Sequence, residues 1–128
     1  MTQPHPQFIV GVGGSAGALS AYKALVDALP SDTGMAFVIV SQIQPVADSL
    51  LGQVLSRRTQ MPVRQGAEGM PIQANHIYVM PGHAALQVKG YAFAAASRRA
   101  KADQPVDLLF RSLAESLGTR AIGVVFSG

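Results

Sequence analysis

Short apolar runs and amphipathic stretches alternate along the chain. Uninterrupted apolar runs bounded by glycine, proline or polar residues are typical of strands that are covered on both faces. They predict strands at 8–10, 35–40, 61–64, 77–80 and 121–126. Because Pro62 cannot donate a ladder hydrogen bond, the third of these strands is expected near a sheet edge.

Helices are predicted where apolar residues recur at helical spacing. Three segments show this spacing: 19–29, 47–58 and 105–117. Asp107 in the first turn of the last helix suits the helix dipole, and Gly118 is a residue type that commonly ends a helix. Two short apolar runs flank Lys89–Gly90, which predicts a small hairpin with glycine in its turn.

Strands that alternate with helices predict an α/β fold. The expected architecture is a three-layer sandwich with a mostly parallel sheet and one antiparallel hairpin. In such sheets, sites form where the carboxyl ends of the strands meet. That edge is expected to gather four segments: Gly11–Gly17, Ser41–Pro45, Pro81–His83 and Ser127–Gly128.

The composition fits one cytoplasmic domain. A length of 128 residues is enough to bury a core, and 48% hydrophobic with only 13% charged residues argues against disorder. The net charge of +3 mildly favours acidic partner surfaces. The first residues lack the features of a signal peptide and no apolar run is long enough to cross a membrane. We therefore expect a cytoplasmic location, no membrane insertion, and a disordered tail over residues 1–7.

The glycine-rich stretch after the first strand carries the strongest chemical signal. Gly13-Gly14-Ser15-Ala16-Gly17 fits the pattern G-x-S-x-G. In that pattern small neighbours allow a sharp strand-to-helix turn that exposes the serine hydroxyl. Ser15 is therefore the first candidate for a nucleophile.

Other interpretations compete for the same glycines. Gly11, Gly13 and Ala16 also fit a weak dinucleotide-binding turn, but the acidic residue expected after the next strand is missing from Val40-Ser41-Gln42. A phosphate-binding P-loop would require a lysine in the turn, and none is present. The glycines can also serve only a close strand-to-helix crossing, with Ser15 near the helix N-terminus.

The remaining polar residues offer no metal or cofactor site. The chain has no cysteine, and three scattered histidines do not make a metal site. His76 precedes a strand and is expected to make a structural hydrogen bond. His83 is expected at the carboxyl edge, either as a base that approaches Ser15 or as a solvent-exposed loop residue.

A basic loop is expected between the hairpin and the last helix, with Arg98, Arg99 and Lys101. It either faces acidic partner surfaces or is simply solvated. No aromatic residues are interleaved with these charges in the way that stacks nucleic-acid bases, so we do not expect nucleic acid as a partner.

Several stretches in a fixed order resemble one family. The stretches IVGVGGSAGAL, DTGMAFVIV, MPV, EGMPIQANHIYVMPG and PVDLLFRSLAESLGTRAIGVVFSG are similar to the catalytic domain of CheB-type chemotaxis protein-glutamate methylesterases. These stretches are most similar to the form of the family that is fused with methyltransferase and sensor-kinase modules. The resemblance runs from Phe8 to the last residue, so residues 8–128 are interpreted as one such domain.

The resemblance implies a serine, histidine and aspartate triad that hydrolyses glutamate methyl esters on chemoreceptors. The family serine maps onto Ser15. The family histidine position holds Gln42, in Ile39-Val40-Ser41-Gln42-Ile43-Gln44-Pro45. The family aspartate follows a stretch that begins at Ser127-Gly128, so the domain is expected to be C-terminally incomplete.

We therefore expect a methylesterase-type domain of chemotaxis and two-component signalling that is impaired or inactive. The alternative is a non-catalytic receptor-binding or regulatory module of a larger signalling protein. A third interpretation is a working esterase that uses His83 as its base. The expected partner is a methylated chemoreceptor or other signalling protein, and a receiver domain in a phosphorelay is a further expectation from the resemblance. We also expect self-association through an exposed sheet face, because the last strand should normally be followed by a covering helix.

Overall fold

A computed structural model of the protein describes residues 5–14, 18–41, 45–80, 86–96 and 104–126. Its helices and strands follow the predicted order. In chain order they are β1 (Ile9–Gly14), α1 (Leu19–Ala28), β2 (Ala36–Ser41), α2 (Pro45–Ser56), β3 (Val63–Gln65), β4 (Ile77–Val79), β5 (Leu86–Lys89), β6 (Ala92–Ala95), α3 (Pro105–Leu117), the short 3-10 helix η3 (Gly118–Arg120) and β7 (Ala121–Phe126).

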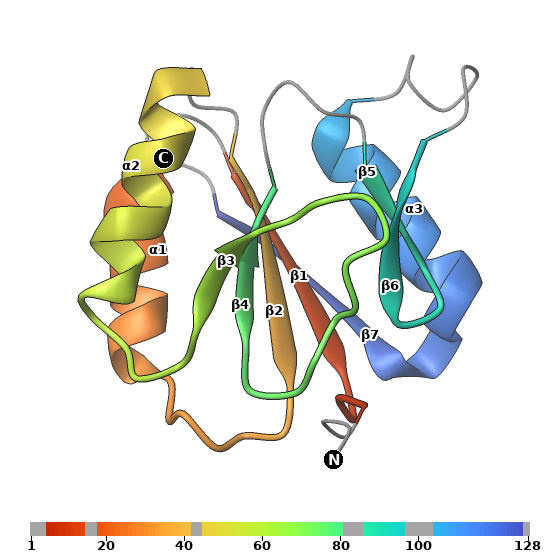
Figure 1. Ribbon diagram of the computed structural model, residues 1–128, viewed down its shortest axis with the longest axis horizontal. Helices are drawn as coiled ribbons and strands as arrows, with labels where there is room; N and C mark the ends of the chain where they lie inside the picture. Colours follow the sequence, from red (N-terminus) through yellow and green to blue (C-terminus); the bar gives the residue numbers. More distant parts are fainter. Residues whose placement is uncertain (1–4, 15–17, 42–44, 81–85, 97–103, 127–128) are drawn as a thin grey trace.

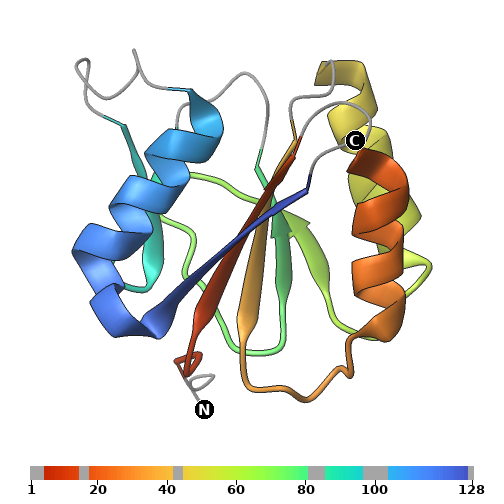
Figure 2. The same cartoon turned by 180° about the vertical axis from the view of Figure 1, so that it is seen from behind.

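The strands form one parallel sheet and one antiparallel hairpin. The sheet order is β3-β4-β2-β1-β7, with all neighbours parallel, and β5 pairs with β6. Helices α1 and α2 cover one face of the sheet, and α3 with the hairpin covers the other (Figures 1 and 2). The predicted three-layer α/β sandwich is confirmed. The strand predicted at 61–64 does lie at a sheet edge, but it is observed as Val63–Gln65, so Pro62 precedes it.

Two apolar clusters fill the space on either side of the sheet. Under α1 and α2 the fully buried side chains include Tyr22 and Leu55. Under α3 and the hairpin they include Tyr78, Phe93 and Leu109, and the rings of the first two meet edge to face at 5.4 Å between centroids. Burial of side chains of this size contributes about 1.5–3 kcal/mol each relative to exposure, which makes these clusters the main source of stability.

The glycines of β1 allow α3 to lie directly against the sheet. A Cβ atom at Gly13 would be 2.7 Å from Cγ1 of Val106, and one at Gly11 would be 2.8 Å from Cδ1 of Leu113. Real carbon atoms do not approach so closely, so the helix packs against strand backbone where any other residue would present a side chain. These glycines therefore serve the packing of a helix from the far end of the chain.

Two serines of α3 attach the hairpin to the helix. The hydroxyl of Ser112 accepts a hydrogen bond from the N–H of Val88 at 3.0 Å and donates to the carbonyl of Leu109 at 2.9 Å. The hydroxyl of Ser116 accepts from the N–H of Gly90 and donates to the carbonyl of Val88, both at 3.1 Å. The backbone groups of Val88 and Gly90 thus have helix side chains as hydrogen-bond partners, as buried or partly buried backbone groups require.

Several predicted boundaries differ from the structure, among them those of the first strand and of the second helix. The first strand was predicted to end at Val10, but it continues to Gly14, because its glycines pair with strands on both sides. Helix α2 ends at Ser56, so the two arginines that follow lie beyond its last turn. One of them, Arg58, forms an exposed ion pair with Asp27, with 2.7 Å between Nη2 and Oδ2.

The segment that we expected to be a disordered tail is described from His5 onward. The His5 ring stacks on Tyr91 with 4.2 Å between centroids, and Pro6 is buried. The N–H of Gln7 donates to the carbonyl of Gly34 at 3.1 Å. Residues 5–7 thus contact the domain, and disorder over residues 1–4 stays a prediction because they lie outside the described residues.

Substitution of Gly13 tests the close packing of α3. We expect Gly13→Ala to lower the free energy of unfolding by about 1–3 kcal/mol, because the stiff Val106 side chain cannot move away without shifting the helix. The matched control is Gly52→Ala in α2, where nothing lies within 4 Å of the added methyl. This change is expected to stabilise by about 0.5–1 kcal/mol. Urea unfolding midpoints measure both, and equal midpoints for the two variants would contradict the packing account.

Candidate functional site

The carboxyl ends of three strands meet at one level of the sheet. Gly14, the last residue of β1, is the register partner of Ser41 at the end of β2 and of Phe126 at the end of β7. Neighbouring strands lie roughly 4.8 Å apart, so these three strand ends lie side by side (Figure 2). This is the edge at which parallel α/β sheets place their sites.

The predicted catalytic residues are next in sequence to this edge. Ser15 directly follows Gly14, and Gln42 directly follows Ser41. Both residues lie outside the described residues. The structure therefore describes only the residue before each of them. These two residues end adjacent strands and are paired in register.

His83 follows a strand in a different position. Its segment comes after β4, whose last residue Val79 pairs with Ile39 of β2. Strand β2 lies between β4 and β1, so β4 ends two strands away from the strand that carries the serine turn. His83 and the basic residues Arg98, Arg99 and Lys101 lie outside the described residues.

Tyr22 of α1 contacts the carboxyl ends of the strands. Its hydroxyl donates a hydrogen bond to the carbonyl of Val40 at 3.4 Å, and its ring meets Phe126 edge to face at 5.9 Å. A Cβ atom at Gly14 would lie 2.9 Å from this hydroxyl and 2.9 Å from a Cβ atom of Ala18. One side chain thus touches the ends of all three strands, and the last glycine of β1 leaves the room for it.

Sequence reasoning identified only the helical spacing of the segment 19–29, which contains Tyr22. The available signal was a hydroxyl-bearing residue at a fully buried helical position, because such a hydroxyl needs a partner. The carbonyl that the Tyr22 hydroxyl reaches depends on the register of β2. That register cannot be predicted from the sequence.

Burial reinforces the protonated state that this tyrosine has at neutral pH. Desolvation raises the pKa of Tyr22 above its ordinary value of 10.0. The hydroxyl therefore stays protonated at neutral pH and acts as a hydrogen-bond donor. It cannot serve as a base toward a neighbouring serine.

Two other titratable residues, His76 and Asp107, lie where structural roles were predicted for them. His76 is buried, and its Nδ1 lies 2.8 Å from the carbonyl oxygen of Ala74, so the structural hydrogen bond predicted for it is confirmed. Asp107 lies in the first turn of α3, as predicted. Among the described residues, no group of three or more His, Cys, Asp or Glu side chains could hold a metal ion.

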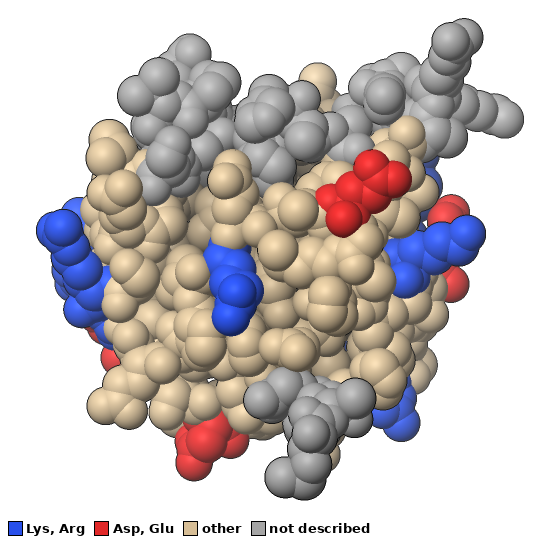
Figure 3. Space-filling model, in the orientation of Figure 1, with Lys and Arg blue, Asp and Glu red and all other residues tan. Residues whose placement is uncertain are grey.

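The surface charges do not gather into one basic area on the side shown in Figure 3. Among the described residues there, lysine, arginine, aspartate and glutamate side chains are scattered over a mostly uncharged surface. No helix in the described ranges has the length and apolar character needed to span a membrane.

Comparisons with known proteins agree on one family. The profile of the CheB methylesterase family matches residues 10–128. The chain is 31% identical to the protein-glutamate methylesterase/protein-glutamine glutaminase 3 of Burkholderia thailandensis and 30% identical to its counterpart of Hydrogenovibrio crunogenus. Each match covers 94% of this chain but only 35% and 33% of those proteins. The chain therefore spans about a third of the length of these relatives.

A solved structure shares the fold. The catalytic domain of the CheB methylesterase of Thermotoga maritima superposes with a TM-score of 0.82 at 21% sequence identity. The match covers 94% of this chain and 67% of that domain. The likeness extends over nearly all of the architecture described above.

The role of Tyr22 predicts a dependence of stability on pH. Since its folded pKa is raised above 10.0, its contribution is fully present below about pH 10 and is lost as the pH rises toward the folded value. Tyr22→Phe should be less stable than the parent by about 0.5–1.5 kcal/mol at neutral pH, the net value of a neutral hydrogen bond. Urea midpoints measured from neutral to strongly alkaline pH should show this gap narrowing. A gap that stays constant or widens would contradict the account.

Proposed function

This chain belongs to the CheB methylesterase family, and we propose that it is a protein-glutamate methylesterase domain of chemotaxis signalling that is impaired in catalysis. Its nucleophile position is Ser15, and the position of the family's base holds Gln42. The proposed substrate is the methyl ester of a glutamate side chain on a chemoreceptor.

The observation that carries this proposal is the pairing of Gly14 with Ser41. These residues end adjacent parallel strands in direct register. Ser15 and Gln42 are the next residues in sequence, so each follows a strand end at the same level of the sheet. This arrangement supports Gln42 as the residue in the place where a base toward Ser15 would be needed.

The chemistry of the two side chains explains the impairment. A serine hydroxyl is a weak nucleophile until a base removes its proton. A glutamine amide donates and accepts hydrogen bonds but takes no proton at neutral pH. The nearby Tyr22 hydroxyl offers no substitute, because burial keeps it protonated. Loss of triad members costs about 10⁴ to 10⁶ in turnover.

The order of the strands makes His83 a poor candidate for the base. The segment that carries it follows β4, and β2 separates β4 from β1. A base must come within about 3 Å of the hydroxyl that it deprotonates. For His83 to do so, its segment would have to cross over the end of β2, where the residues around Gln42 follow.

The proposed setting is a cytoplasmic signalling protein in which a receiver domain of a phosphorelay regulates the site. Its partner is a methylated chemoreceptor, and neither nucleic acid nor membrane insertion is part of the proposal. The names of the relatives also include protein-glutamine glutaminase, and hydrolysis of a side-chain amide would require the same missing base. A domain that keeps the receptor-docking surface without turnover would act as a binding or regulatory module, which is the alternative function.

Hydrolysis of methyl esters on a methylated receptor tests the proposal. We expect no turnover above background for the parent or for Ser15→Ala. Gln42→His should raise turnover if the missing base alone limits the reaction. Binding of the parent to the same receptor is measured in parallel by titration, with unmethylated receptor as the control.

Each outcome assigns the domain to one of the alternatives. Binding without turnover supports a pseudoenzyme that acts as a binding module. Turnover by the parent that is abolished by Ser15→Ala would contradict the impairment, and loss of that activity in His83→Ala would identify the substitute base. Absence of both binding and turnover would overturn the proposed substrate.

A further inference from the structure

An open polar hollow lies where α1 and α2 end. The last turns of these two helices are side by side in both ribbon views (Figures 1 and 2). The hollow has a volume of about 390 Å³ and is lined by Leu29, Ser31, Arg57, Arg58, Thr59 and Gln60. These residues belong to the connections that lead into β2 and β3. The hollow therefore lies at the amino ends of the strands, at the opposite end of the sheet from the carboxyl edge.

Hydrogen-bond donors dominate the lining of this hollow. The side chains of arginine, serine, threonine and glutamine can all donate, and among the described residues no aspartate or glutamate lines it. The hydroxyl oxygen of Thr59 accepts a hydrogen bond from the N–H of Met61 at 3.0 Å, so its own proton is available to a ligand. Leu29 adds one apolar side chain. A lining of this kind suits a ligand that is rich in acceptor oxygens.

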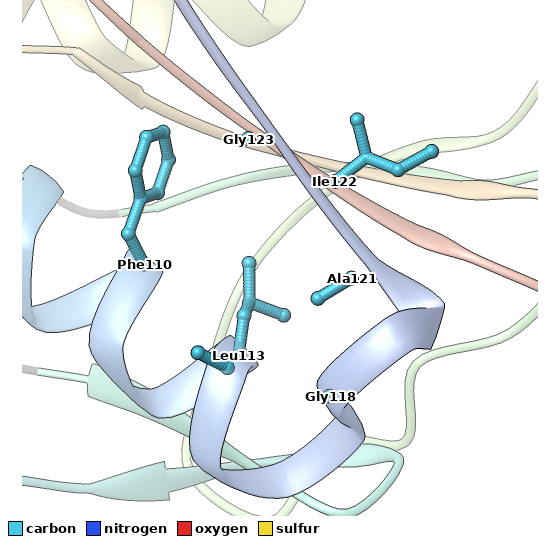
Figure 4. Close-up of a pocket in the computed structure, with 7 residues that line it drawn as sticks. Phe110, Leu113, Gly118, Ala121, Ile122 and Gly123 are labelled. Atoms are coloured by element: carbon cyan, nitrogen blue, oxygen red, sulfur yellow. The ribbon is translucent and has the colours of Figure 1, made fainter.

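Another hollow of the molecule has the opposite character. It lies between α3 and β7, and the labelled side chains of Phe110, Leu113 and Ile122 there carry no polar atoms (Figure 4). It offers no side-chain hydrogen bond to an anion. The polar lining at the ends of α1 and α2 is thus a particular property of that site and not of every hollow on this surface.

The ion pair with Asp27 orients one arginine of the polar hollow. Nε of Arg58 donates to Oδ1 of Asp27 at 2.9 Å, and Nη2 donates to Oδ2 at 2.7 Å. These bonds use only part of the N–H groups of the guanidinium, and those of Nη1 remain for a ligand. Because two bonds fix the plane of the guanidinium, less side-chain freedom is lost when a ligand binds.

Arg57 supplies a second cationic group. Within the described part of the chain its guanidinium has no hydrogen bond or ion pair. The carboxyl ends of α1 and α2 oppose an anion here, each with roughly half a negative charge. The N–H groups of Leu29 and Arg58 bond to carbonyls of these last turns at 3.2 and 3.0 Å, which weakens that field. An anion in the hollow would gain direct charge-assisted hydrogen bonds, whereas solvent screens the helix ends.

We propose that this hollow binds the phosphoryl group of a small phosphomonoester, with Arg57 and Arg58 as its charged donors. Such a group carries a charge of about −1.5 to −2 at neutral pH and three acceptor oxygens. The planar fork of arginine matches these oxygens, and the hydroxyls of Ser31 and Thr59 can bond the remainder. A carboxylate has only two oxygens for the same donors. Small-molecule sites occupy about 300–1,000 Å³, so the hollow also has room for the organic part of the ligand.

Titration with glycerol phosphate tests this proposal, which does not depend on the proposed function. Backbone amide signals of the isotope-labelled chain are followed by nuclear magnetic resonance. The parent should show saturable shifts at residues 29–31 and 57–60. Arg57→Gln removes a charged donor, and Gln60→Glu places a carboxylate in the lining. Each should weaken binding by about tenfold or more, as expected for hydrogen bonds to a charged group.

Arg120→Gln is the matched control. It removes an exposed cation of η3, outside the hollow, and lowers the net charge as much as the other two changes do. This variant should bind like the parent, and circular dichroism verifies that all variants are folded. Succinate, a carboxylate ligand, should bind more weakly than glycerol phosphate. Absence of saturable shifts in the parent, unchanged affinity in Arg57→Gln, or equally tight binding of succinate would each overturn the proposal.

Discussion

The structure depends on β1 as a buried central strand with almost no side chains on its α3 side. Every residue of β1 is buried, and the strand pairs in register with β2 and β7 along its full length. Gly11 and Gly13 let α3 approach the strand backbone, and Gly14 leaves space for the Tyr22 hydroxyl. A larger residue at any of these positions would separate a helix from the sheet. The same glycines thus determine the packing of both outer layers against the sheet.

This constraint separates the fold from the chemistry. The register of β1 with β2 is given by backbone pairing of residues 9–14 with residues 36–41, and position 42 comes after these paired residues in the sequence. In the proposed function, a glutamine at this position leaves that register in place and cannot take the proton of Ser15. A domain can therefore keep the architecture of a hydrolase without its reaction, since a fold positions a site and does not supply the site's residues.

The sequence was sufficient to predict the layers, the order of the elements and the hairpin, because continuous apolar runs and helical spacing are local patterns. It also predicted the surroundings of His76, whose partner lies two residues away. It did not predict that Gly11 and Gly13 contact α3, or that Tyr22 reaches Val40. These contacts join segments that are far apart in the chain, and they depend on register and on which helix covers which face.

The sequence predicted an exposed sheet face at the last strand, but it did not predict which residues of β7 are exposed. Its uninterrupted apolar run resembles that of the buried strand β2, yet residues along it are half-buried or exposed because it lies at the sheet edge. Hydrophobicity alone does not distinguish a central strand from an edge strand, since the neighbours decide the burial. The predicted site residues have a different status. Ser15, Gln42 and His83 follow strand ends that the structure describes, while they themselves lie outside the described residues.

The intrinsic reactivity of Ser15 tests the central claim most directly. A serine-directed fluorophosphonate is mixed with the chain, and the labelled residue and its rate are measured by mass spectrometry over a range of pH. The account predicts that Ser15 of the folded parent reacts no faster than the serines of the urea-unfolded chain, because no base activates it. Rapid and selective labelling of Ser15, with a rate that rises through a single ionisation near neutral pH, would show that a base is present and would contradict the account.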